Sequence, residues 1–344
     1  CWSVRLFHQW RERLELKESR CGFSPVGVVW IPSTKAEDHA QALHHFQDVG
    51  VPGGLVPAEE IRQRYPALNL CPHALDLTGE EHACQDAPSL FFEPDGGYAD
   101  PQGTTEDLMR AAADQGVELF VRHQVTGIES AGGTHTVRCG NGATFSGGLL
   151  LNACGPWFQS LNAMVGVTLP MNLAPVRVQI ATRDRPADVV GALPVFVSAA
   201  DQLYARPEAN GRQLMAGSTA PEDEREAIRD PDHFEPSASP ETRQRMMHKL
   251  HHRLAMQSRG SVRGYAALYT VNRDDWHPVI DALGPEGYFV ANGFSGHGFK
   301  LAPSVGALIG RMMSGVSLPD DPQVDVSYFA ANRRPIVSSG GVLA

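Results

Sequence analysis

The chain has 344 residues and a formal net charge of −10, with 42% hydrophobic and 20% charged residues. This length and composition are typical of a two-domain globular protein with a large core. Because the chain is acidic and lacks 18 consecutive apolar residues, we expect neither a nucleic-acid partner nor a membrane span.

The first 66 residues are expected to alternate helices and strands. Apolar residues recur at helical spacing over residues 2–14, which predicts an amphipathic helix. Residues 27–33 (GVVWIPS) predict a strand and residues 35–50 a helix. Residues 58–65 predict a short helix that Pro66 ends.

The stretch from residue 105 to residue 155 has a regular order of elements. Residues 105–117 predict a helix, residues 118–130 a strand, and residues 135–145 a hairpin that turns at Asn141 and Gly142. Residues 148–153 predict a buried strand that runs into a glycine turn. This order is typical of one half of a dinucleotide-binding domain.

Residues 170–270 differ in kind, because short strand-like runs surround one charged helix at 240–257. They predict an antiparallel sheet with a helix against it. We therefore expect an α/β nucleotide-binding domain interleaved with an α+β substrate domain. The expected ranges are 1–26, 88–165 and 271–344 for the first domain, and 27–87 and 166–270 for the second.

The segment 287–315 (GYFVANGFSGHGFKLAPSVGALIGRMMSG) predicts a buried strand, a glycine loop and a helix with Pro303 in its first turn. Gly293, Gly296 and Gly298 allow a flat ligand close to the backbone, because no Cβ intervenes. The positive end of the helix then favours a partial negative charge on that ligand. An ordinary joint with packing glycines is the alternative.

The sequence GFSGHGFKLAPSVG resembles the C-terminal flavin loop of the D-amino-acid-oxidase-like (DAO) flavoenzymes, and is most similar to the monomeric sarcosine oxidase branch. The resemblance extends to residues 92–155, 264–280 and 325–333. Members of this family bind FAD and oxidise the C–N bond of an amino acid or secondary amine by hydride transfer to the flavin. The resemblance thus implies an FAD-dependent amine or amino-acid oxidoreductase (EC 1.4 or 1.5) with a small carboxylated amine substrate.

The resemblance also implies roles for individual residues. Three positions would contact the substrate: Lys300 and Tyr269 would bind its carboxylate, and Tyr204 would line the active site. His297 would lie near the flavin ring, although a purely structural role in the loop is the alternative. The remaining cofactor contacts would come from Val125 at the adenine, the turn Gly155–Trp157, and Gly296, His297, Gly298, Phe299 and Lys300 at the ring.

The sequence departs from the family pattern at three places. Ala267 stands where the sarcosine oxidase branch has a cysteine bonded to the flavin, so we expect non-covalent FAD. Met215 aligns with a lysine that assists oxygen reduction, which favours a dehydrogenase or a slow oxidase. The GxGxxG unit that normally opens the family is absent, and we expect it to lie upstream of Cys1. A non-catalytic binding or assembly subunit is therefore the alternative function.

The cysteines and histidines raise two questions, which are the redox state of the thiols and the binding of a metal ion. Six cysteines without a CxxC motif predict reduced thiols in a cytoplasmic compartment: Cys1, Cys21, Cys71, Cys84, Cys139 and Cys154. The pattern Cys71-Pro-His73 with His82-Ala-Cys84 matches no common zinc motif, so we expect incidental residues of a solvent loop and no metal. His248, His251 and His252 are expected on a solvated helix face. The sequence specifies neither the substrate side chain, the electron acceptor nor the oligomeric state.

Overall fold

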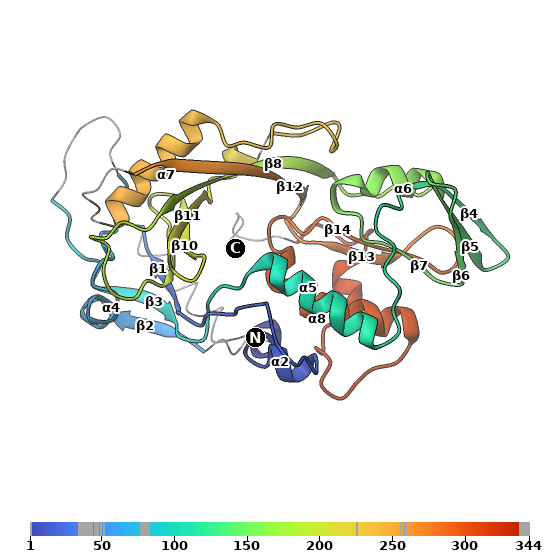
Figure 1. Ribbon diagram of the computed structural model, residues 1–344, viewed down its shortest axis with the longest axis horizontal. Coiled ribbons are helices and arrows are strands. Elements are labelled where there is room, and N and C mark those ends of the chain that lie inside the picture. Colours follow the sequence, from blue (N-terminus) through green and yellow to red (C-terminus); the bar gives the residue numbers. More distant parts are fainter. Residues whose placement is uncertain are drawn as a thin grey trace.

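We describe the fold from a computed structural model, which defines residues 2–33, 44, 48, 50, 52–75, 83–224, 226–254, 256 and 260–336. The largest unit is an eight-stranded sheet, seen at the left and top of Figure 1. Its strands, in spatial order, are β12 (Val262–Asn272), β8 (Leu173–Asp184), β11 (Gln213–Ser218), β10 (Leu203–Glu208), β9 (Val195–Ser198), β1 (Val28–Ile31), β3 (Ser89–Glu93) and β2 (Gly54–Pro57).

Neighbouring strands of this sheet run antiparallel except β1 and β9, which are parallel. The antiparallel sheet expected from residues 170–270 is confirmed for β8 to β12. β3 begins one residue after the domain boundary expected at residue 88 and pairs with β1 and β2 in this same sheet. The domain boundaries themselves stay a prediction.

One face of the eight-stranded sheet is covered by helices and forms the main core. Two helices cover this face, α7 (Pro240–Arg253) and α4 (Ala58–Arg64). Every second side chain of β1, β9, β10 and β11 points toward them. These side chains pack with Met246, Met247 and Leu250 of α7 and with Ile61 of α4. We call this the closed face. The methionine pair contributes to the core because both side chains are almost fully buried.

Two smaller sheets lie at the other end of the molecule (Figure 1). The first contains β13 (Val279–Ala282), β14 (Tyr288–Asn292) and β7 (Leu150–Asn152), with β14 and β7 parallel. The second is the meander β4 (Val125–Ala131), β5 (Thr134–Cys139) and β6 (Thr144–Gly147). The predicted hairpin is confirmed, since Gly142 has the positive φ of 88° that its turn requires. Every residue of β14 is buried, as its apolar sequence predicts.

The remaining elements complete the connections between the sheets. They are α1 (Trp2–His8), α2 (Trp10–Arg13), α5 (Pro101–Asp114), α6 (Phe158–Met164), α8 (Gly298–Ser314) and three short 3-10 turns at Gly155–Trp157, Pro221–Glu224 and Val326–Phe329. Among the described residues, no helix combines the length and apolar character needed to span a bilayer.

Three local expectations differ from the structure or fall outside it. The strand expected from residue 118 begins only at Val125, and the apolar residues 117, 119, 120 and 121 before it are exposed. Pro303 lies in the second turn of α8, not the first, because the helix already begins at Gly298. The helix expected over 35–50 falls mostly outside the described residues.

Asp107 on α5 anchors the N-terminal segment. Its side chain is fully buried, and its Oδ2 atom accepts hydrogen bonds from Trp10 Nε1 (3.1 Å), Ser19 Oγ (2.8 Å), Arg20 N (2.8 Å) and Cys21 N (3.0 Å). Burial alone would raise the pKa of Asp107, but these hydrogen bonds and the one from Arg110 outweigh it and lower the pKa below its ordinary value.

We expect Asp107→Asn to lower the free energy of unfolding by about 3 kcal/mol at neutral pH, because buried donors lose a charged acceptor. A carboxyl with a lowered folded-state pKa stabilises the fold above its ordinary pKa and loses this effect as pH falls through the lowered value. The difference between wild type and variant, measured by urea unfolding, should therefore stay constant near neutral pH and shrink as the pH falls below about 4. Asp114→Asn, at an exposed position of the same helix, is the control, and a pH-independent difference would contradict the role of the charge.

Candidate functional site

The second face of the eight-stranded sheet is not covered by α4 or α7, and we call it the open face. Directly paired residues on adjacent strands point the same way, so the pairing registers assign each side chain to a face. The open face carries Glu93, Trp30, Val197, Tyr204, Arg206, Met215, Gly217, Val176, Val178, Ile180, Tyr265, Ala267 and Tyr269. Both tyrosines expected in the active site, Tyr204 and Tyr269, thus face the same side.

Tyr204 lies in a row that crosses three strands. It pairs with Val197 of β9, which in turn pairs with Trp30 of β1. On its other side Tyr204 pairs with Gly217, where an added Cβ would come within 2.4 Å of the tyrosine ring. The glycine therefore leaves the space in which the ring of Tyr204 lies.

Glu93 adds a carboxylate to the open face beside this row. Trp30 Nε1 donates a hydrogen bond of 2.7 Å to Glu93 Oε1. Burial raises the pKa of Glu93, while the hydrogen bond from Trp30 and the charge of Lys300 act in the opposite direction. The charge of Glu93 therefore acts on Lys300 in the first turn of α8.

Lys300 is the cation at this end of the site. Solvent reaches its side chain, but enough protein surrounds the ammonium group that desolvation lowers the pKa of Lys300. The charge of Glu93 opposes this by favouring the protonated lysine. A partly desolvated cation interacts more strongly with an incoming carboxylate than a fully solvated one does.

Tyr269 lies at another part of the open face. It pairs with Val176 on β8, and its ring packs with Val271 and Trp276. Three strand spacings of about 4.8 Å separate β12 from β10, so the structure does not bring Tyr269 against Tyr204. A ligand contacting both would have to extend across the sheet.

The glycine loop connects the smaller sheet, through β14, with the eight-stranded sheet at β12. Ser295 N donates to Thr270 O (3.0 Å), and Asn272 N donates to Ser295 Oγ (3.0 Å), so the loop is fixed to the end of β12 just beyond Tyr269. Gly293 and Gly296 have φ values of 76° and 83°, which favour glycine. The loop therefore begins α8 next to the open face.

The N-terminus of α8 supplies hydrogen-bond donors. First-turn N–H groups have no acceptor within a helix, and His297 at the N-cap makes no side-chain capping bond. Together with the helix dipole, these N–H groups suit a partial negative charge. The pyrimidine edge of a flavin ring is such a partner, and this assignment stays a prediction. A Cβ on Gly293 would lie 2.9 Å from Leu173 and one on Gly298 3.2 Å from Phe294, so these two glycines allow close packing within the protein. The GxGxxG sequence that usually binds the pyrophosphate does not occur in this chain.

The other expected cofactor residues lie at three places. The turn at Gly155 is fixed to β14, since Asn292 Nδ2 donates to Gly155 O (3.0 Å), and so lies beside the glycine loop. Trp157 is exposed and donates to Asp232 Oδ1 (3.0 Å). Phe299 stacks on Phe7 of α1, with ring centroids 5.7 Å apart. Val125 is further along, at the start of β4. These roles stay predictions.

The open-face residues Trp30, Glu93, Arg206 and Tyr265 were not predicted from the sequence. Each stands in a strand whose side chains alternate, but alternation shows only that two faces differ and not which face a ligand meets. The parallel pairing of β1 with β9 brings Trp30 near Tyr204, and the two strands lie far apart in the sequence.

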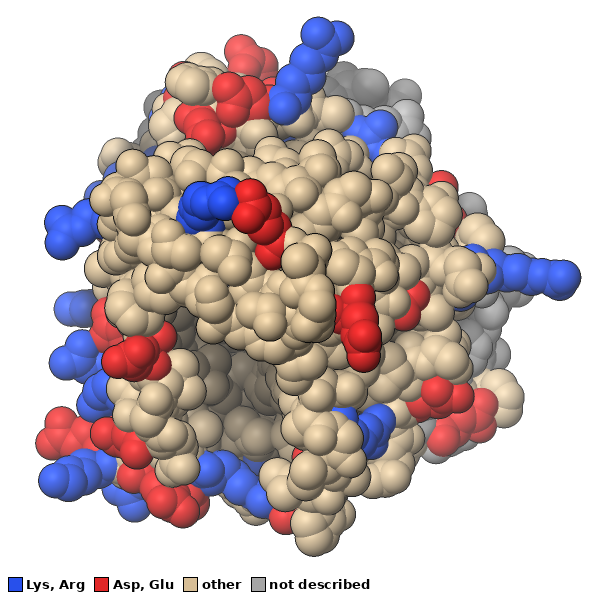
Figure 2. All heavy atoms as spheres, turned by 90° about the vertical axis from the view of Figure 1, so that its right-hand side faces the viewer, with Lys and Arg blue, Asp and Glu red and all other residues tan. Residues whose placement is uncertain are grey.

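Figure 2 shows the molecule from the end that carries the two smaller sheets, and a hollow is visible in that face.

The pKa of Lys300 can be measured directly, because the chain has only four lysines: Lys17, Lys35, Lys249 and Lys300. We expect the ¹³C-methylated Lys300 to titrate below its ordinary pKa in NMR spectra, and Glu93→Gln to lower its pKa further by removing the opposing charge. Lys249 should not shift in the variant and serves as the internal control. An unchanged pKa of Lys300 in Glu93→Gln would contradict the assigned interaction.

The chain matches the profile of the DAO family, described as FAD dependent oxidoreductase, over residues 2–312. It is 22% identical to monomeric sarcosine oxidase from Bacillus sp. (strain B-0618), an alignment that covers 98% of this chain and 82% of that protein. It is 23% identical to FAD-dependent oxidoreductase domain-containing protein 1 from Xenopus laevis, with 85% of this chain aligned. The chain spans 61% of the length of that relative.

The fold is also similar to that of a solved enzyme. L-proline dehydrogenase from P. horikoshii superimposes with a TM-score of 0.77 at 19% sequence identity, covering 96% of this chain and 80% of that one. The mixed α/β fold with an antiparallel sheet, predicted from the sequence, is therefore confirmed. FAD is the cofactor that this family implies. The family profile matches nearly the whole chain, and the protein thus belongs to the FAD-dependent oxidoreductases of the DAO family.

Proposed function

We propose that the protein oxidises the C–N bond of a small amino acid with a secondary or N-methyl amine. The observation that carries this proposal is the placement of Lys300, a partly desolvated cation in the first turn of α8 that interacts with Glu93 of the open face. A substrate carboxylate bound to Lys300 would lie between the flavin end of α8 and the sheet.

The chain's own residues would do two things for the reaction. The N–H groups at the start of α8 would hold the electron-rich edge of the flavin, and Lys300 would hold the carboxylate so that the reacting carbon faces the ring. Trp30 would orient Glu93, and the charge of Glu93 would favour the protonated form of Lys300. FAD, when bound, supplies the hydride acceptor for the C–N carbon.

The substrate class is supported by the relatives. Two relatives that are named for a reaction are a sarcosine oxidase and an L-proline dehydrogenase, and both sarcosine and proline are amino acids with a secondary amine. The sequence identities are low, so the side chain that this protein accepts is not carried over. We propose the shared chemistry, which is a carboxylate next to a carbon that bears a secondary amine.

We further propose non-covalent FAD and slow reaction with oxygen. Ala267 on the open face offers no nucleophile to the flavin. Met215 offers no cation to stabilise superoxide and lies 3.9 Å from Tyr265 Oη. The nearby cation, Arg206, forms an ion pair with Glu208, which offsets its charge. These features favour a dehydrogenase.

The test is flavin reduction by the protein expressed from its complete coding region. We expect a yellow protein whose flavin is bleached without oxygen by sarcosine, N-methylated amino acids or proline, and is reoxidised faster by an artificial acceptor than by oxygen. Acid precipitation should release the flavin into the supernatant, because Ala267 cannot hold it covalently. Ala267→Ser, which is equally unable to form the thioether link, is the matched control.

Two outcomes would contradict these proposals. Failure to bind FAD at any concentration would favour the alternative function, which is a non-catalytic binding or assembly subunit. That alternative is based on the lack of a GxGxxG sequence in this chain. Flavin that is bound but not reduced by any carboxylated secondary amine would reject the substrate class and leave the family assignment intact.

A further inference from the structure

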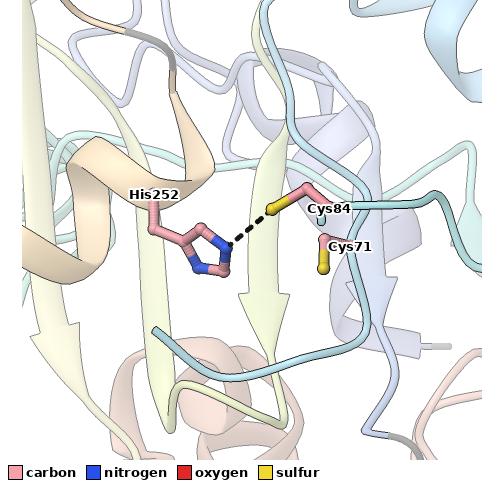
Figure 3. A group of neighbouring side chains, drawn as sticks. All are labelled: Cys71, Cys84 and His252. Carbon is pink, nitrogen blue, oxygen red and sulfur yellow. Dashed lines mark hydrogen bonds between the residues drawn. The ribbon is translucent and has the colours of Figure 1, made fainter. Parts of the chain in front are cut away.

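A group of potential metal ligands lies on the other side of the sheet from Lys300. Cys71, Cys84 and His252 place one ligand atom each within 4.8 Å of one another (Figure 3). His252 stands near the end of α7, the helix on the closed face, and the two cysteines come from the segment between α4 and β3. The sequence pattern instead suggested His73 and His82 as partners of the cysteines, and His82 falls outside the described residues.

The distance between one sulfur and the imidazole nitrogen matches tetrahedral zinc. Zinc–sulfur and zinc–nitrogen bonds of about 2.3 and 2.0–2.1 Å place a sulfur and a nitrogen ligand about 3.6 Å apart. Cys84 Sγ and His252 Nε2 are 3.5 Å apart. Two thiolates and an imidazole are the ligand types that zinc prefers among common divalent ions.

A second layer of contacts orients the imidazole. Asp201 Oδ2 lies 3.4 Å from His252 Nδ1, so a proton on Nδ1 leaves the lone pair of Nε2 directed at the sulfur atoms. Asp201 is buried and also accepts hydrogen bonds from Leu75 N (2.7 Å) and from Ser198 Oγ (3.0 Å). The side chain of His252 is only 7% exposed, so the expectation of a solvated helix face is wrong for this residue.

The backbone that carries the cysteines is fixed to the same helix. The buried guanidinium of Arg253 donates to the carbonyl oxygens of Cys71 and His73 and to Asp201. Asn69 Nδ2 donates to His252 O (2.8 Å) and lies 3.6 Å from Cys84 Sγ. The ligands are thus held together by contacts that do not depend on a metal ion.

The thiol groups differ in exposure. Cys71 is buried, whereas Cys84 is exposed, which leaves one side of the group open to water.

We propose that Cys71, Cys84 and His252 bind one zinc ion, with water as the fourth ligand. Binding releases the two thiol protons, so the two thiolates balance the charge of the ion. The ion joins the segment between α4 and β3 to the end of α7 and is separate from the flavin chemistry. We assign it the role of joining these two segments.

The test is metal content by mass spectrometry after expression from the complete coding region without a histidine tag. We expect about one zinc per chain in the wild type and at least a tenfold loss in Cys71→Ser, Cys84→Ser and His252→Ala. His248→Ala, at an exposed position of the same helix, is the matched control and should keep its zinc. Full zinc in His252→Ala would overturn the proposal.

A second measurement does not depend on the variants folding. Wild-type protein loaded with cobalt should show thiolate-to-cobalt charge transfer and the visible bands of tetrahedral cobalt, and a chelator should remove both and lower the melting temperature. A metal-free wild-type protein with a Cys71–Cys84 disulfide in peptide mapping would overturn the proposal. An octahedral cobalt spectrum without charge transfer would also overturn it.

Discussion

The register of the eight-stranded sheet is the constraint on which the rest of the structure depends. Since paired residues share a face, a slip of one residue in any strand would exchange its closed-face and open-face side chains. The closed face is specified by a continuous core under α4 and α7, which makes such a slip costly. The hydrophobic core therefore determines that Trp30, Tyr204 and Tyr269 all face the open side.

The loop from Gly293 to Gly298 places the start of α8 beside the eight-stranded sheet. Its hydrogen bonds to Thr270 and Asn272 fix the start of α8 to the end of β12, and β14 feeds into it from the smaller sheet. The charge of Glu93, on β3 at the far side of the same face, favours the protonated form of Lys300 in the first turn of α8. We propose that the helix donors, this cation and the aromatic sheet face together bind the cofactor and the substrate.

Much of the fold could be predicted from local patterns. The apolar sequence of β14, the Asn141–Gly142 turn and the helical periodicity of α5 and α7 are all signals within short segments. The spacing of the glycines alone left the role of the loop ambiguous. The loop could be assigned because its sequence also resembles the flavin loop of the DAO family. The start of α8 was misjudged because Pro303 usually marks a first turn, whereas here the helix accommodates it one turn later.

The contacts between distant segments could not be predicted. Nothing in the sequence near Trp30 indicates that β1 pairs with β9, or that the charge of Glu93 acts on Lys300. In the same way, His252 reads as one of three histidines on a charged helix until the fold brings Cys71 and Cys84 to it. Sequence patterns define faces of single elements, and only tertiary pairing decides which faces meet.

The central claim is that Lys300 binds a substrate carboxylate between α8 and the open face. The most direct measurement is the dissociation constant of a non-reactive carboxylate, such as methylthioacetate, from the flavin-loaded protein, followed by the flavin spectrum. Lys300→Met should weaken this binding at least tenfold and leave FAD affinity nearly unchanged, because we assign the flavin edge to backbone N–H groups and not to the lysine side chain. Equal carboxylate affinity in both proteins would contradict the account.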